Sequence, residues 1–165
     1  MKELLEKVTP GITTYWADIS DETTLPEERF DICTIMGVLS IFDHHEKILD
    51  NILKLFAEKK CLYLFGFFNP YDYDVFVKAR NAKKHEVDGE DVLEAGWNYL
   101  SKLSLIKYCD SRNLKCEFTP FKVNFDIPRH EDDPLRSWTI GCGEDVIVVN
   151  GLQQILSFYL CKIYN

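Results

Sequence analysis

The 165-residue sequence lacks the short motifs that identify several common classes of enzyme. It contains six cysteines but no C-x-x-C pair, and it has no P-loop, no H-E-x-x-H motif and no Ser-His-Asp order. These absences argue against a zinc knuckle or a dithiol redox site, and they give hydrolase and kinase functions no support. Cys33 and Cys61 lie in predicted buried strands, where free thiols behave as small hydrophobic groups, so we expect a reducing cytoplasm.

Long apolar runs and an excess of basic residues are also missing. No stretch approaches the roughly 20 consecutive apolar residues that a membrane-spanning helix needs. Residues 1–10 (MKELLEKVTP) contain no apolar run of signal-peptide length. The formal net charge of −8 disfavours a nucleic-acid backbone, because phosphate binding requires clustered Lys and Arg. We therefore expect neither a membrane nor a nucleic acid as a partner.

A strand, a glycine turn, a helix and a second strand follow one another early in the chain. Phe30 to Met36 is a mostly apolar run of the kind found in parallel strands, and Gly37 ends it. Asp43 is the expected N-cap of a helix over residues 45–59, and residues 61–68 form the next buried strand. This βαβ order predicts an open α/β sheet, which binds ligands at the carboxyl ends of its strands.

The rest of the chain is consistent with one globular domain. With 46% apolar residues, a chain of 165 residues can bury a substantial core. Further elements are predicted as helices over 2–8, 74–81 and 101–112, strands over 12–17, 115–127 and 155–164, and a hairpin over 138–149. Gly141 and Gly143 lead into a strand and not into a helix, so we interpret them as a turn and not as a nucleotide loop.

The segment ADISDETTLPEERFDICTIMGVLSIFDH (17–44) resembles the class I S-adenosylmethionine-dependent methyltransferases. In that family an Ala-Asp pair closes the third strand, and a phrase of this kind forms the fourth strand and its loop. The later part of the chain is similar to bacterial, type 11-like methyltransferases of the kind found beside surface-glycan genes. The phrases that carry this narrower similarity are NPYDYDVFVKAR (69–80), EAGWN (94–98), HEDDPLRSWTI (130–140) and NGLQQIL (150–156).

The resemblance implies a particular fold. It is α/β, a partial Rossmann-like methyltransferase sheet, mostly parallel with an antiparallel C-terminal strand pair and with helices on both faces. Residues 1–165 would form a single domain in which residues 70–100 are a substrate-side insertion or lid. The family's glycine-rich loop and ribose-binding acidic residue have no counterpart in the sequence. We therefore expect a domain truncated at its N-terminus, in which the strand over 12–17 lacks its usual neighbour.

The resemblance also implies a cofactor, S-adenosylmethionine, and residues to hold it. Asp18 would accept a hydrogen bond from the adenine amino group, and Ile19 would lie against the ring. Met36, Gly37 and Val38, at the end of the next strand, would lie near the methionine part of the cofactor. A glycine in this position permits close approach of a ligand to the backbone.

Residues on the acceptor side are weaker candidates, each with a structural alternative. His44 could act as the base for the acceptor proton, or it could be a solvated helix start. Because His44 and His45 are adjacent, they point to different faces of a helix, and we expect no metal site there. Trp97 and Asn98 could line an acceptor pocket, or Trp97 could anchor a loop on the core. Arg136 could position a substrate, or it could belong to a solvated acidic loop.

Two hypotheses about function follow. The first is methyl transfer from S-adenosylmethionine to a small-molecule or glycan-type acceptor, impaired or absent in a truncated chain. The second is a non-catalytic α/β scaffold that forms a homodimer, or binds a partner protein such as a missing N-terminal half, through an exposed sheet edge.

Overall fold

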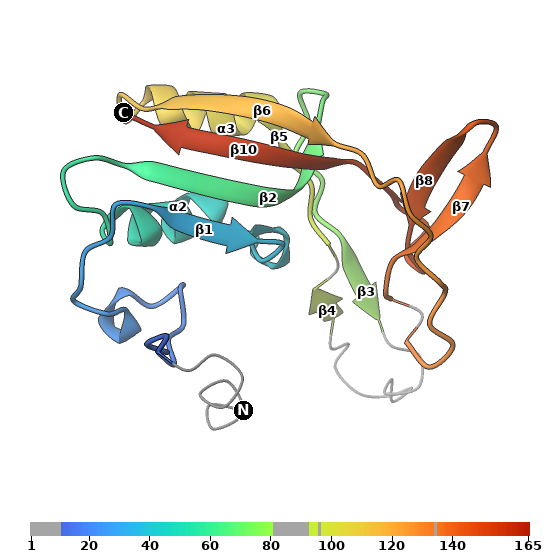
Figure 1. The fold of residues 1–165 in the computed structure, drawn as a ribbon, viewed down its shortest axis with the longest axis horizontal. Helices are drawn as coiled ribbons and strands as arrows, with labels where there is room; N and C mark the ends of the chain where they lie inside the picture. The colour runs from blue at the N-terminus through green and yellow to red at the C-terminus, as the bar shows by residue number, and fades with distance from the viewer. Residues whose placement is uncertain (1–10, 81–92, 96, 134) are drawn as a thin grey trace.

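The computed structural model of the protein describes residues 11–80, 93–95, 97–133 and 135–165 (Figure 1). The predicted helix over 2–8 and the polar segment around 88–89 lie outside these residues. Among the described residues, no helix is long and apolar enough to cross a membrane.

The main sheet has the strand order β1-β2-β10-β6, and a short strand, β5, also pairs with β2. Its strands are β1 (Cys33–Met36), β2 (Cys61–Asn69), β5 (Leu100–Ser101), β6 (Lys115–Phe121) and β10 (Phe158–Tyr164). Strands β1 and β5 run parallel to β2, whereas β10 is antiparallel to both β2 and β6. Consequently β10 alone runs against the others, which confirms a mostly parallel sheet and an antiparallel pair, β6 and β10, that includes the C-terminal strand.

Two short α-helices and two small sheets accompany the main sheet. The helices are α2 (His45–Leu53) and α3 (Lys102–Asp110), and two 3-10 turns are η1 (Glu22–Thr24) and η2 (Leu39–Ile41). One small sheet pairs β3 (Lys78–Arg80) with β4 (Leu93–Ala95), and the other has the order β7 (Trp138–Cys142), β8 (Asp145–Val149), β9 (Ile155–Leu156).

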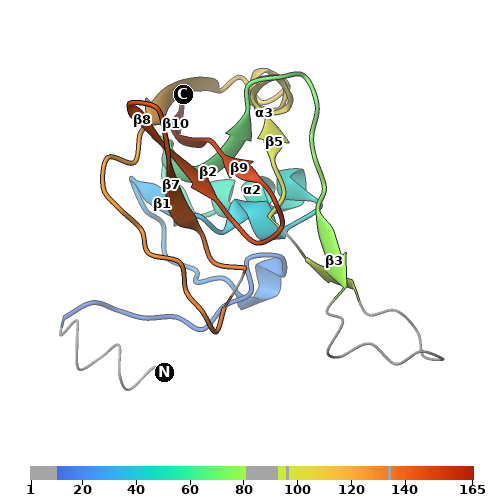
Figure 2. The same ribbon diagram turned by 90° about the vertical axis from the view of Figure 1, so that its right-hand side faces the viewer.

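The core lies on one face of the main sheet. Alternate residues of β2, such as Leu62 and Leu64, are buried there together with Leu49 of α2 and Leu105 of α3. Figure 2 shows α2 and α3 on the same side of the sheet. The expectation of helices on both faces is therefore not met by the described residues. Instead, the other face carries half-buried aromatic rings, which the alternation of β2 directs away from the helices.

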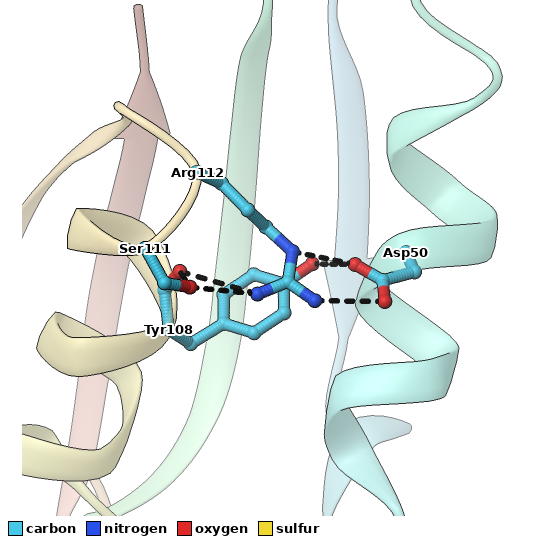
Figure 3. Close-up of polar contacts among 4 residues, drawn as sticks. All are labelled: Asp50, Tyr108, Ser111 and Arg112. Atoms are coloured by element: carbon cyan, nitrogen blue, oxygen red, sulfur yellow. Dashed lines mark hydrogen bonds and ion pairs between the residues drawn. The ribbon is translucent and has the colours of Figure 1, made fainter.

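A carboxylate on α2 joins the two helices (Figure 3). Arg112 donates two hydrogen bonds to the Asp50 carboxylate, at 2.7 and 2.8 Å, and the Tyr108 hydroxyl donates a third at 2.7 Å. The Arg112 guanidinium also lies over the Tyr108 ring, 3.8 Å from its centroid. The hydrogen bonds from Arg112 are the main cause of the lowered pKa of Asp50, while burial and Asp50 raise the pKa of Tyr108.

Helix α2 is shorter than its sequence pattern predicts, because it ends at Leu53 and not at residue 59. The reason is a contact with a distant residue. The Phe30 N–H donates to the Leu55 carbonyl at 2.8 Å, and the Ala57 N–H donates to the Phe30 carbonyl at 3.2 Å. These bonds replace those that would continue the helix, so the chain turns while Leu55 stays in the core.

Two other predicted elements are absent from the described part of the chain. Residues 12–17 form no strand; they are mostly exposed and follow an irregular path. A strand needs a neighbour for its backbone groups, and the described residues provide none. Residues 74–80 form no helix, because Val75 pairs with Tyr99 and β3 follows directly.

The other predicted elements are present with changed bounds: the strand predicted over 115–127 ends at Phe121, and the strand predicted over 30–36 begins at Cys33. Ser101 caps α3, its hydroxyl accepting from the Leu103 N–H at 3.1 Å. Gly143, at φ +65°, makes the turn between β7 and β8. The predicted strand over 155–164 is divided at Ser157 into β9 and β10.

The substitution Asp50→Asn should destabilise the fold at pH 7 by on the order of 1 kcal/mol, since solvent screens a pair this exposed. The folded protein lowers the pKa of Asp50, so the stabilisation is present at neutral pH and is lost as the pH falls through the folded pKa. The variant should therefore lose less stability between pH 7 and about pH 3 than the parent chain. Urea denaturation at both pH values measures this. An equal effect of Asp126→Asn, at an exposed loop aspartate, would contradict the assignment.

Candidate functional site

The carboxyl end of β1 is open and apolar. Gly37 adopts φ +73°, and its N–H donates to the Phe65 carbonyl in β2 at 2.7 Å. A Cβ added at Gly37 would find no atom within 4 Å, so the space above its backbone is free. The flanking Met36 and Val38 side chains are 59% and 39% exposed. This end of the strand can therefore accept a ligand directly against the backbone.

A small cavity lies next to this strand end, between η2, the start of α2 and the second half of β2. Its walls include Ser40, His45, Phe65, Asp74 and Asn98, and its volume is about 20 Å³. A space of this size holds one water molecule. Neither Asp18 nor Gly37 lines it.

His45 lines this cavity and has one buried ring nitrogen. Its Nε2 atom is inaccessible to solvent and has no hydrogen-bond partner among the described residues. Burial lowers the pKa of His45, and the nearby carboxylate of Asp74 opposes that shift. The lowered pKa favours the neutral form of the ring, which lines a water-sized space. Asp74 itself accepts from the Ser101 N–H at 2.6 Å and the Ser104 hydroxyl at 2.9 Å.

His44, the predicted base, has a different position. It is exposed and is the N-cap residue of α2, although its side chain makes no capping hydrogen bond. The prediction that Asp43 is the N-cap is wrong, because the Asp43 carboxylate accepts hydrogen bonds from Lys78 and Asn98. Sequence periodicity could have selected His45, since it stands at i, i+3 and i+7 spacing with Ile48 and Ile52, which are buried.

Asn98 is buried and binds two loops together. Its N–H donates to the Ser40 carbonyl at 2.8 Å, and its side-chain oxygen accepts from the Val77 N–H at 2.9 Å. Its side-chain nitrogen donates to Asp43 at 2.9 Å. Asp43 also pairs with Lys78 at 2.7 Å, and the hydrogen bond from Lys78 is the main cause of the lowered pKa of Asp43. Asn98 therefore positions the cavity wall, and the sequence pattern gave no sign of Asp43 and Lys78 as its partners.

Trp97 belongs to an aromatic cluster on the face of the sheet opposite the helices. Its ring stacks on Phe67 with centroids 5.3 Å apart, and Phe67 also contacts Tyr99 and Phe158. The Trp97 carbonyl accepts from Gln154 at 2.9 Å. One face of the Trp97 ring is thus already covered.

The other predicted residues lie outside the cavity lining. The Asp18 carboxylate accepts from the N–H and the hydroxyl of Ser20 at 2.8 and 2.7 Å, and these bonds lower the pKa of Asp18. Ile19 packs partly against the core, and its carbonyl accepts from Asn51 of α2 at 2.9 Å. Arg136 pairs with Asp133 at 3.1 Å in the loop before β7. Among the described residues, no cluster of three or more His, Cys, Asp or Glu side chains could hold a metal ion.

Comparisons with known proteins give one kind of match. No family model matches the chain, and no curated protein matches it. Among solved structures, a SAM-dependent methyltransferase from Methanosarcina mazei is similar, with a TM-score of 0.51 and 9% sequence identity. The match covers 99% of this chain and 76% of that chain. At this identity the similarity shows the fold alone, so the chain has a mixed α/β fold of the kind seen in a SAM-dependent methyltransferase.

The pKa of His45 provides a direct test of the cavity. NMR titration should give a value below the ordinary 6.5 for His45. The substitution Asp74→Asn should lower it further, because it removes the negative charge that favours the imidazolium. The matched substitution Asp72→Asn, at an exposed aspartate two positions earlier, should leave the titration unchanged. A His45 pKa above 6.5, or one that the Asp74→Asn substitution leaves unchanged, would contradict the described burial of Nε2 beside Asp74.

Proposed function

We propose that this chain serves S-adenosylmethionine-dependent methyl transfer to a small-molecule or glycan-type acceptor. The observation that carries the proposal is the sheet β1-β2-β10-β6, in which β10 alone is reversed, with an open glycine at the carboxyl end of β1. Open α/β sheets bind ligands at this end of their strands. The similarity to a solved SAM-dependent methyltransferase supports the same function.

The residues at the end of β1 fit a ligand with an apolar chain and polar ends. Gly37 leaves room for contact with the backbone, and Met36 and Val38 offer exposed apolar surface. When bound, S-adenosylmethionine would supply the methyl group on its sulfonium. Asp18 would use its second carboxylate oxygen for adenine, since Ser20 occupies the first. Ile19, beside it, would give the ring an apolar contact.

The acceptor must lose a proton during the reaction, and His45 is the better-supported base. Its neutral ring can accept a proton, and the Asp74 carboxylate would stabilise the imidazolium that results. A water in the adjacent cavity would relay the proton to His45 Nε2. His44, in contrast, is exposed and does not line this cavity. Within this proposal Asn98 positions the cavity wall, whereas Trp97 and Arg136 remain candidates for contact with the acceptor.

Affinity for the cofactor should be low in this chain. The Asp18 carboxylate is exposed and is held by its own turn, and the cavity beside β1 is lined by neither Asp18 nor Gly37. A ligand would therefore have to span two separately placed groups without an enclosing pocket. We therefore expect methyl transfer by this chain to be weak or absent. Binding of the ligand at the carboxyl end of β1 can still be measured.

Isothermal titration of S-adenosylmethionine and S-adenosylhomocysteine into the purified chain tests the proposal. We expect saturable binding with a dissociation constant in the micromolar to millimolar range, weakened about tenfold or more by Gly37→Ala. An alanine at φ +73° is strained and its Cβ occupies the space reserved for the ligand. The control is Gly141→Ala, in β7, where a Cβ meets no atom within 4 Å and φ is not positive. No saturable heat with either ligand, or equal effects of the two substitutions, would overturn the proposal.

A further inference from the structure

The outer edge of β1 has unpaired backbone groups. Because the Gly37 N–H binds β2, and alternate residues of a strand point to opposite sides, Thr34 and Met36 direct their N–H and carbonyl groups outward. The described residues place no strand on that side. The edge is also apolar, since Ile32 is 61% exposed and Met36 is exposed as well. Natural proteins protect such an edge with charges, bulges or a partner.

A second segment of the same chain also has backbone groups without hydrogen-bond partners among the described residues. Residues 12–17 (ITTYWA), here named the N-terminal arm, consist mostly of β-branched and aromatic residues, which favour strands. The structure gives the arm no backbone hydrogen bond among the described residues. Its Ile12 and Trp16 side chains are 63% and 82% exposed. The arm has the composition of a strand, and no segment in the described part of the chain pairs with it.

We propose that two copies of the chain exchange their N-terminal arms, each arm adding as a strand to the β1 edge of the other copy. A two-fold pair satisfies both arms and both edges at once, because each copy supplies one of each. Figure 1 shows β1 at the lower edge of the main sheet, with the chain that precedes it running below that edge.

The lack of charged side chains and the exposed apolar side chains favour a second copy of the chain as the partner of the β1 edge. Neither the arm nor residues 32–36 carry a charged side chain, so pairing brings no like charges together. The two segments and the adjacent Val38 and Ile41 also expose large apolar side chains, which a second copy would remove from water.

Among the described residues, the arm does not pair with its own β1. Its continuation is fixed on α2, where Asn51 binds the Ile19 carbonyl at 2.9 Å and Lys54 pairs with Glu22. Exchange with a second copy leaves these two contacts in place, although it moves the Tyr15 hydroxyl, which donates a hydrogen bond to Glu28 of its own copy. The interface does not depend on methyl transfer, and it gives the scaffold hypothesis a specific partner and surface.

Sedimentation velocity of the full chain over about 1–100 μM, without any cofactor, tests the exchange. We expect a dimer whose dissociation constant rises at least about tenfold in Trp16→Asp. The matched control is Tyr73→Asp, because Tyr73 is an aromatic residue 74% exposed far along the chain from the arm. The control should dimerise as the parent chain does.

A second variant tests the edge. Thr34→Pro removes an N–H that points outward and leaves the β1–β2 bonds intact, so it should abolish the dimer while circular dichroism and thermal unfolding remain those of a folded monomer. A monomeric parent chain at 100 μM, a dimer insensitive to Trp16→Asp and Thr34→Pro, or an open polymer would each overturn the proposal. Because no cofactor is present, these results are independent of the calorimetric test of methyl-donor binding.

Discussion

Burial of one face of β2 is the constraint on which the rest of the structure depends. This strand pairs with β1, β10 and β5, and Leu62 and Leu64 are almost fully buried. The apolar side chains of α2 and α3 complete that core, and the Asp50–Arg112 contact fixes one helix against the other. Once β2 is fixed, the carboxyl end of β1 and the start of α2 lie side by side. The open glycine and the half-buried histidine therefore result from one packing arrangement.

The two faces of the sheet have different consequences. The helix-covered face is closed by aliphatic side chains and buried thiols, whose pKa values burial raises, so Cys109 and Cys161 are inert fillers of the core. The opposite face carries stacked aromatic rings around Phe67, and no strand of the described residues pairs with the outer edge of β1. We therefore propose ligand binding at the carboxyl end of β1 and dimerisation at its outer edge, because the described residues leave backbone groups there without partners.

The sequence pattern predicted those elements that are stabilised by residues next to them in the chain. The apolar run over 61–68, the capped helix after Ser101 and the glycine turn at 143 were predicted because each depends on residues next to it. The early end of α2 was missed, since it depends on Phe30, more than twenty residues away in the sequence. Residues 12–17 were predicted as a strand from composition alone, but a strand also needs an adjacent strand, which composition does not supply. At the candidate site, helical periodicity could have chosen His45 over His44, whereas the contacts of Asn98 with Asp43 and Ser40 are set by tertiary packing.

The central claim is that the carboxyl end of β1 binds the methyl donor. Amide chemical shifts recorded while S-adenosylhomocysteine is added to the labelled chain test it most directly, because they locate the bound ligand. We expect saturable shifts at Gly37 and its neighbours Met36 and Val38, with little change in the β7–β8 hairpin. Shifts confined to that hairpin, or no shifts at millimolar ligand, would contradict it.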